Sequence, residues 1–295
     1  MRAVPPIRLL WLTSGDCDRN MRLLDQIAQA SAPLEIVDVR GVQRLPCARD
    51  HRRDVVDCPL RFVLDQTAAD RCFDLLRSDA GMLAAENSFL RVPATNFWME
   101  WPCRPSDGAG ARSGLLVEAD GSGRRGRILT FWEQADGEPV PAQAAVAFDL
   151  ENACSLQEAR GRRSALLPGS HPLASNLMFV VDDAWMEHLV LGGAEAVRRS
   201  MRAIAANLLA GVEFLFVFSA LLSERTELAR EPIDLSALNR QRTKRGRPPL
   251  LDHVEVRLDL SALPGCGVGG AEPVREAPRL HVVRGHMVRR QRATF

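Results

Sequence analysis

The chain lacks or nearly lacks several residue types. Its 295 residues include no tyrosine and a single lysine, Lys244, so 37 of the 38 cationic residues are arginine. This bias is typical of a GC-rich coding sequence, and arginine abundance therefore does not by itself indicate bidentate recognition of an anion. Aromatic residues make up 5% of the chain, so any cluster of them is informative.

The sequence gives little support to a metal, disulfide or nucleotide site. The seven cysteines are scattered, odd in number and never in a Cys-x-x-Cys spacing, which argues against a zinc ribbon and a disulfide framework. The N-terminal third, where the pattern indicates a strand, a helix and a strand, lacks the Gly-x-Gly-x-x-Gly loop of a nucleotide site, so we expect no cofactor. Helix capping by Asp182 or Asp183 explains the acidic cluster with Glu187 and His188 better than a metal site does. No secretory leader precedes Pro5, and the expected location is cytoplasmic.

One stretch is long enough to cross a membrane. Residues 203–223 carry a single charge, Glu213, near the centre. An acidic residue at that depth costs roughly 2.5 to 3.5 kcal/mol on insertion scales. We therefore expect a buried core helix and no membrane partner.

The pattern of apolar residues predicts an α+β fold. We expect an N-terminal α/β region over residues 1–90, and a second region over 91–295 with a central antiparallel β-meander, packed helices and a basic C-terminal strand pair; one continuous domain is the alternative. Expected strands are 7–13, 34–39, 113–118, 127–133, 144–150, 177–181 and 250–260. Expected helices are one through Leu23 and Ile27, then 67–77, 183–192, 194–222 and 234–242.

A dense aromatic patch precedes the meander. Phe97, Trp98 and Trp101 surround Glu100. Burial of this carboxyl would raise its pKa. The alternative is that the tryptophans simply cover the sheet.

Charge is distributed unevenly. From Ala237 onwards the chain carries 12 Lys and Arg against five Asp and Glu, a net of +7, so the rest carries −6. The string Thr243 to Pro248 resembles an AT-hook, whose Arg-Gly-Arg-Pro core lies in the minor groove of DNA. A helix stop explains the same residues, with Gly246 left-handed and two prolines following. Three cations of this segment are candidate nucleic-acid contacts: Lys244, Arg245 and Arg247.

The last 17 residues, from Arg279, hold five arginines, two histidines and no acid. Arg284, Arg289 and Arg290 are further candidate phosphate contacts. His281 and His286 are candidate acid and base of a phosphodiesterase or nuclease. A strand whose histidines form internal hydrogen bonds is the alternative.

The segments 238–250 and 279–286, together with the run from Pro93 to Trp101, resemble an uncharacterised family of bacteriophage and prophage proteins. That family tends to have lysine at the place of Arg247, and it usually continues past the place of Phe295 with another aromatic and basic strand. The resemblance implies a phage or prophage origin and no catalytic assignment.

Three functions stay open. The first is an accessory protein that binds nucleic acid, or a nucleic-acid-processing complex, through the basic C-terminal surface. The second is the His281/His286 enzyme. The third is an inhibitory or structural protein that binds a host or phage partner.

Overall fold

The computed structural model describes residues 21–37, 44–78, 90–103, 112–134, 136–153, 164–166, 173–223 and 228–259. The chain up to Leu258 makes one compact unit, and residues from Asp259 onwards make a second. The expected strand at 7–13 and the basic strand pair at 279–295 lie outside the described residues.

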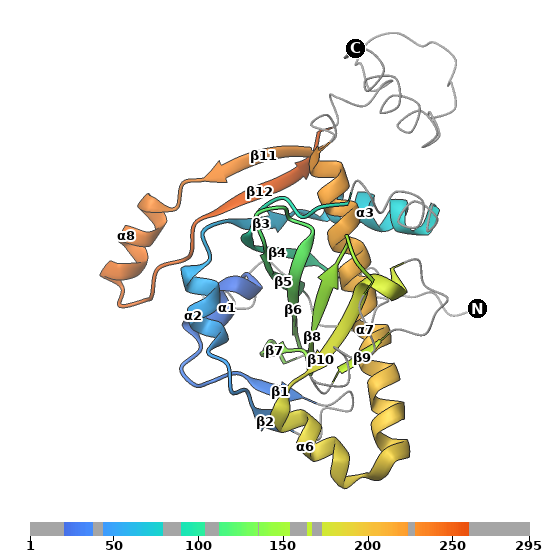
Figure 1. The fold of residues 1–295 in the computed structure, drawn as a ribbon. Helices are drawn as coiled ribbons and strands as arrows, with labels where there is room; N and C mark the ends of the chain where they lie inside the picture. The colour runs from blue at the N-terminus through green and yellow to red at the C-terminus, as the bar shows by residue number, and fades with distance from the viewer. Residues whose placement is uncertain are drawn as a thin grey trace, which may run out of the picture. The chain divides into compact units, whose positions relative to one another are not determined.

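Most of the expected elements are present (Figure 1). In chain order they are α1 (Leu23–Gln29), β1 (Glu35–Val37), β2 (Arg44–Pro46), α2 (His51–Asp57), β3 (Arg61–Leu64), α3 (Gln66–Ser78), β4 (Asn96–Pro102), β5 (Arg112–Ala119), β6 (Arg125–Glu133), β7 (Pro139–Pro141), β8 (Ala144–Asp149), β9 (Ser164–Leu166), a 3-10 turn (Ala174–Asn176), β10 (Leu177–Val181), α6 (Asp183–Leu191), α7 (Gly193–Ser223), β11 (Leu228–Ile233), α8 (Ser236–Lys244) and β12 (His253–Leu258).

The main sheet is mixed and mostly antiparallel. Its ten strands run in the order β11-β12-β3-β4-β5-β6-β8-β10-β9, with β7 paired to β6. The predicted meander is the β5, β6 and β8 part of this sheet, and the α+β class is confirmed. Two parallel pairs, β12 with β3 and β3 with β4, interrupt the antiparallel pattern. The proposed boundary near residue 90 therefore falls inside one sheet.

Both faces of β4 are buried. Phe97, Met99 and Trp101 point to one face of the sheet, where the Trp101 ring stacks on Phe214 of α7 at 4.3 Å. Trp98 and Glu100 point to the other face and are fully buried there. A central strand covered on both sides carries bulky residues without alternation, which is why this segment reads as an aromatic patch in the sequence.

Helices α3 and α7 cover the first face of the sheet (Figure 1). Phe214, Phe216 and Phe218 of α7 are all fully buried, and Phe218 meets Phe62 of β3 edge to face at 5.5 Å. Among the described residues α7 is the one helix long and apolar enough to cross a membrane, and 67% of its most apolar window is buried within the fold. This burial agrees with the expected core helix.

Helices α1 and α2 cover the opposite face. Leu23, Leu24 and Ile27 of α1 are fully buried in a cluster with Trp98 and Phe131 of the sheet. Gly114 of β5 makes room for this packing, because a Cβ there would lie 2.5 Å from the Trp98 ring. The α1 and α2 face carries most of the buried polar side chains described below.

Candidate functional site

Among the described residues, the exposed basic segment around α8 is the part of the surface to which the sequence analysis points. α8 connects β11 to β12, two strands at one edge of the sheet, and it buries none of its residues (Figure 1). Between Asp234 and Asp252 the chain carries five cationic residues and no acidic one. They are Arg240, Arg242, Lys244, Arg245 and Arg247. We call residues 236–250 the basic turn.

Hydrogen bonds from side chains hold the basic turn in shape. The Asn239 amide donates to the carbonyl of Leu250 at 3.0 Å and accepts from the Leu250 N–H at 2.8 Å. Arg242 Nε donates to the carbonyl of Pro248 at 2.8 Å. Since a nine-residue helix that buries nothing is marginal in water, these bonds and the end of the helix account for its presence.

The helix ends as the sequence predicts. Gly246 has φ +68°, the left-handed conformation that favours glycine after a helix. Basic residues occupy the last turn, where they offset the helix dipole. The helix-stop interpretation is confirmed, and contact of the same residues with DNA stays a prediction.

The structure brings three of the candidate contacts together. Lys244, Arg245 and Arg247 are exposed and follow one another around the end of α8. The other candidates, His281, His286, Arg284, Arg289 and Arg290, lie outside the described residues. Their roles stay predictions.

Glu100 is the most enclosed carboxyl of the described fold. Its Oε2 accepts from the Leu24 N–H at 2.9 Å and from Trp98 Nε1 at 3.1 Å, and its Oε1 accepts from Arg112 Nε at 2.8 Å. Burial raises its pKa, while the Arg112 guanidinium acts in the opposite direction. Because no oxygen faces open space, the carboxylate fastens α1 to the sheet. Burial thus raises the pKa of Glu100 in the expected direction, and Trp98 and Trp101 are buried against the sheet as the alternative predicted.

A second polar cluster lies beside it. Arg22 binds Asp25 at 2.6 Å and also contacts the ring of His253 on β12. Asp25 accepts from the Leu251 N–H at 2.8 Å, and its burial raises its pKa. Burial and the Arg22 charge lower the pKa of His253 to about 4. These contacts tie the residues that follow the basic turn, Leu251 and His253, to the start of α1.

A thiol and an imidazole meet between β2 and α2. Cys47 Sγ lies 3.0 Å from Nε2 of His51, and Nδ1 of His51 lies 3.8 Å from Asp54 Oδ2. His51 is 4% exposed, and its Nδ1 has no hydrogen-bond partner among the residues that the structure describes. Burial, with a contribution from the Arg49 charge, lowers the pKa of His51 to about 4, and burial raises the pKa of the Cys47 thiol. The pair is therefore a neutral thiol and a neutral imidazole at pH 7.

This pair lines a pocket of about 370 Å³ on the α1 and α2 face of the sheet. Leu129, Phe131 and Ala145 contribute apolar side chains from β6 and β8. Arg49 and Arg127 contribute positive charge, although both also bind Glu118. Asp182 lines the pocket near α6, where its carboxylate caps that helix by accepting from the Ala184 and Trp185 N–H groups.

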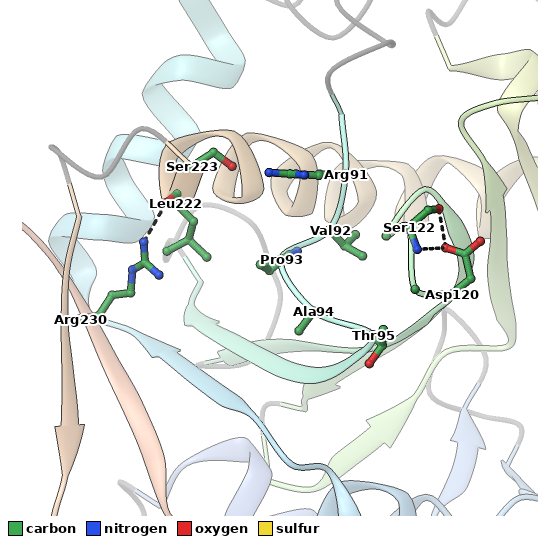
Figure 2. Close-up of a pocket in the computed structure, with 12 residues that line it drawn as sticks. Arg91, Val92, Pro93, Ala94, Thr95, Asp120, Ser122, Leu222, Ser223 and Arg230 are labelled. Atoms are coloured by element: carbon green, nitrogen blue, oxygen red, sulfur yellow. Dashed lines mark hydrogen bonds between the residues drawn. The ribbon is translucent and has the colours of Figure 1, made fainter.

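A larger hollow of about 600 Å³ lies between residues 91–95, the turn at 120–123, the end of α7 and β11. Figure 2 shows Arg230 and Asp120 on opposite sides of it. Arg230 donates to the carbonyl of Leu222 at 2.8 Å and so caps α7, while Asp120 accepts from the hydroxyl and N–H of Ser122. The side chains of Arg230 and Asp120 in this hollow therefore serve the fold.

Within the described ranges, no group of three or more His, Cys, Asp or Glu side chains is placed to hold a metal ion. Comparison of the chain with family models, with curated proteins and with solved structures gave no match. The function must therefore be argued from the geometry of the chain itself.

Sequence reasoning did not find the Cys47 and His51 site. Nothing in the sequence separates Cys47 from the other six cysteines, and His51 stands alone as a histidine between two charged residues. The available signal was Asp50, which caps α2 by accepting from the Arg53 N–H and so fixes where the helix begins. Only the fold then shows that His51, the residue after this cap, lies against Phe131 of the sheet.

Proposed function

We propose that the protein is a phage or prophage accessory protein that binds nucleic acid through a basic surface, acting in the cytoplasm. The observation that carries the proposal is the basic turn, a helix without buried residues that displays cations on a frame of side-chain hydrogen bonds. A fold gains little stability from such an element. Its retention is explained if the displayed charges bind an anionic partner.

The expected contacts are to phosphates. Lys244, Arg245 and Arg247 lie in a segment without acidic residues, and a cluster of cations of this kind contacts the backbone rather than the bases. Arg284, Arg289 and Arg290 are proposed to extend the same function. Binding then depends steeply on salt, because each phosphate contact releases a counterion.

The test is fluorescence anisotropy with labelled single- and double-stranded DNA and RNA over a range of salt concentrations. The variant Lys244→Ala, Arg245→Ala, Arg247→Ala is expected to weaken binding for all sequences. It should also reduce the slope of log K against log salt by about 2 to 3, at roughly 0.7 to 0.9 per contact. The variant Arg284→Ala, Arg289→Ala, Arg290→Ala tests the C-terminal contacts in the same way.

A matched control removes the same charge elsewhere. Arg198, Arg199 and Arg202 are exposed on α7, and their triple alanine variant should bind as the wild type does. Equal weakening by this control, or binding that ignores salt, would reject the proposal. Absence of binding to every probe would favour a protein partner from the phage or the host.

A further inference from the structure

The Cys47 and His51 pair has the features of a reactive centre and not only of packing. The thiol and Nε2 are within hydrogen-bond distance at 3.0 Å, and both residues line the same pocket. The other ring nitrogen of His51 is almost entirely buried and forms no hydrogen bond with any described residue. A buried polar atom without a partner costs about 1 to 3 kcal/mol, and sites that keep such a cost are often functional.

The order of groups is that of an activated nucleophile. A nucleophilic thiol needs a base within hydrogen-bond reach, and the base needs a third group that orients it. Here Nε2 faces the thiol and Nδ1 faces Asp54 at 3.8 Å, which is beyond hydrogen-bond distance in this structure. Such contacts are commonly long before a substrate binds.

We propose that Cys47 and His51 are the nucleophile and general base of an acyl-transfer site that accepts a small acyl thioester or activated ester. The apolar side chains of Leu129, Phe131 and Ala145 suit a short acyl chain, and about 370 Å³ limits its size. This activity is independent of nucleic-acid binding by the basic turn.

The first step forms a bond between Cys47 Sγ and the carbonyl carbon while the thiol proton passes to His51 Nε2. The tetrahedral intermediate then expels the leaving thiolate or alkoxide, which takes the proton back from His51. The products are an acyl thioester on Cys47 and the free thiol or alcohol. Water or another acceptor then removes the acyl group.

The choice of substrate follows from the weak basicity of the histidine. The pKa of His51 is lowered to about 4 by burial, so the imidazole takes the thiol proton only in concert with attack. A thiol activated by so weak a base needs an electrophilic carbonyl with a weakly basic leaving group, such as the thiolate of a thioester or the aryloxide of an aryl ester. An amide of the same acyl group, whose carbonyl is far less electrophilic, is expected to be inert.

The experiment uses the full chain with p-nitrophenyl acetate and an acetyl thioester, followed by proteolysis and mass spectrometry. Cys103 is the internal control, because it is also partly exposed and its thiol lies 3.0 Å from the Ser113 hydroxyl. Cys47 should be acetylated at least about 100-fold faster than Cys103, the lower range for general base catalysis. Similar rates at the two cysteines would overturn the proposal.

The pH profile separates general base catalysis from plain thiolate reactivity. The rate at Cys47 should rise with an inflection near the His51 pKa of about 4 and stay level to pH 8, whereas a free thiolate gains rate up to the thiol pKa. A rate at Cys47 that climbs steadily through pH 8 would refute the role of His51. The variant His51→Gln should lower the Cys47 rate at least about 100-fold and leave Cys103 unchanged; the wild-type profile decides the question if this variant does not fold.

Discussion

Removing the negative charge of Glu100 should destabilise the protein strongly. Glu100→Gln keeps the size of the side chain, but one of its two terminal atoms becomes an N–H donor. Every partner of the carboxylate is also a donor: the Leu24 N–H, Trp98 Nε1 and Arg112 Nε. Either orientation of the amide therefore places donor against donor and leaves a buried group without an acceptor.

The expected loss of stability in Glu100→Gln follows from the burial of the Glu100 and Arg112 ion pair. Breaking a buried ion pair by removing one partner costs about 3 to 5 kcal/mol. Arg112 is 22% exposed and Glu100 is 0% exposed, so the arginine is partly rehydrated and the lower end, about 3 kcal/mol, applies. At roughly 2 to 4 °C per kcal/mol in a domain of this order of size, the midpoint of thermal unfolding should fall by about 6 to 12 °C.

The assay is urea and thermal unfolding at pH 7, with Glu118→Gln as the control. Glu118 also binds two arginines, Arg49 and Arg127, but it is 28% exposed, and a partly exposed pair is worth about 1 kcal/mol or less. A loss below about 1 kcal/mol for Glu100→Gln, or a larger loss for Glu118→Gln, would refute this account. A small loss for Glu100→Gln in particular would mean that Glu100 is already protonated in the folded protein.

Two further predictions concern stability. The folded pKa of His51 is about 4 against an ordinary 6.5, so below pH 6.5 the unfolded chain takes up a proton that the fold refuses. About 3 kcal/mol of stability, fully present above pH 6.5, should be lost as the pH falls to 4. Urea unfolding of the wild type and of His51→Gln at several pH values tests this. Parallel curves of unfolding free energy against pH for the two proteins would contradict it. Gly123→Ala should cost more than Gly246→Ala in thermal unfolding. Both glycines have φ +68°, which costs about 1 to 2 kcal/mol for alanine, but only at Gly123 would the Cβ meet a backbone oxygen, that of Val92 at 2.7 Å. Equal losses would refute the steric argument.

Local patterns in the sequence predict the meander and the described helices other than α2 closely. The expected strand 177–181 matches β10, and the expected helices 67–77 and 194–222 are α3 and α7 to within one residue at each end. Capping by Asp182 and the left-handed Gly246 were also predictable. Each of these features depends on residues within a few positions of one another, so the sequence alone is sufficient.

The tertiary structure determined which strands pair with one another. β3 is short, β11 has a run of exposed residues from Ala229 to Pro232, and β4 carries an acid among aromatic residues, so none of the three shows the alternation of a half-buried strand. Their place in the sheet depends on pairing with distant segments, as when β12 joins β3 across almost 200 residues. The same holds for the sites. The basic turn is visible in the sequence because its charges are contiguous, whereas the Cys47 pocket is not, because β6, β8 and α6 reach Cys47 only through the fold.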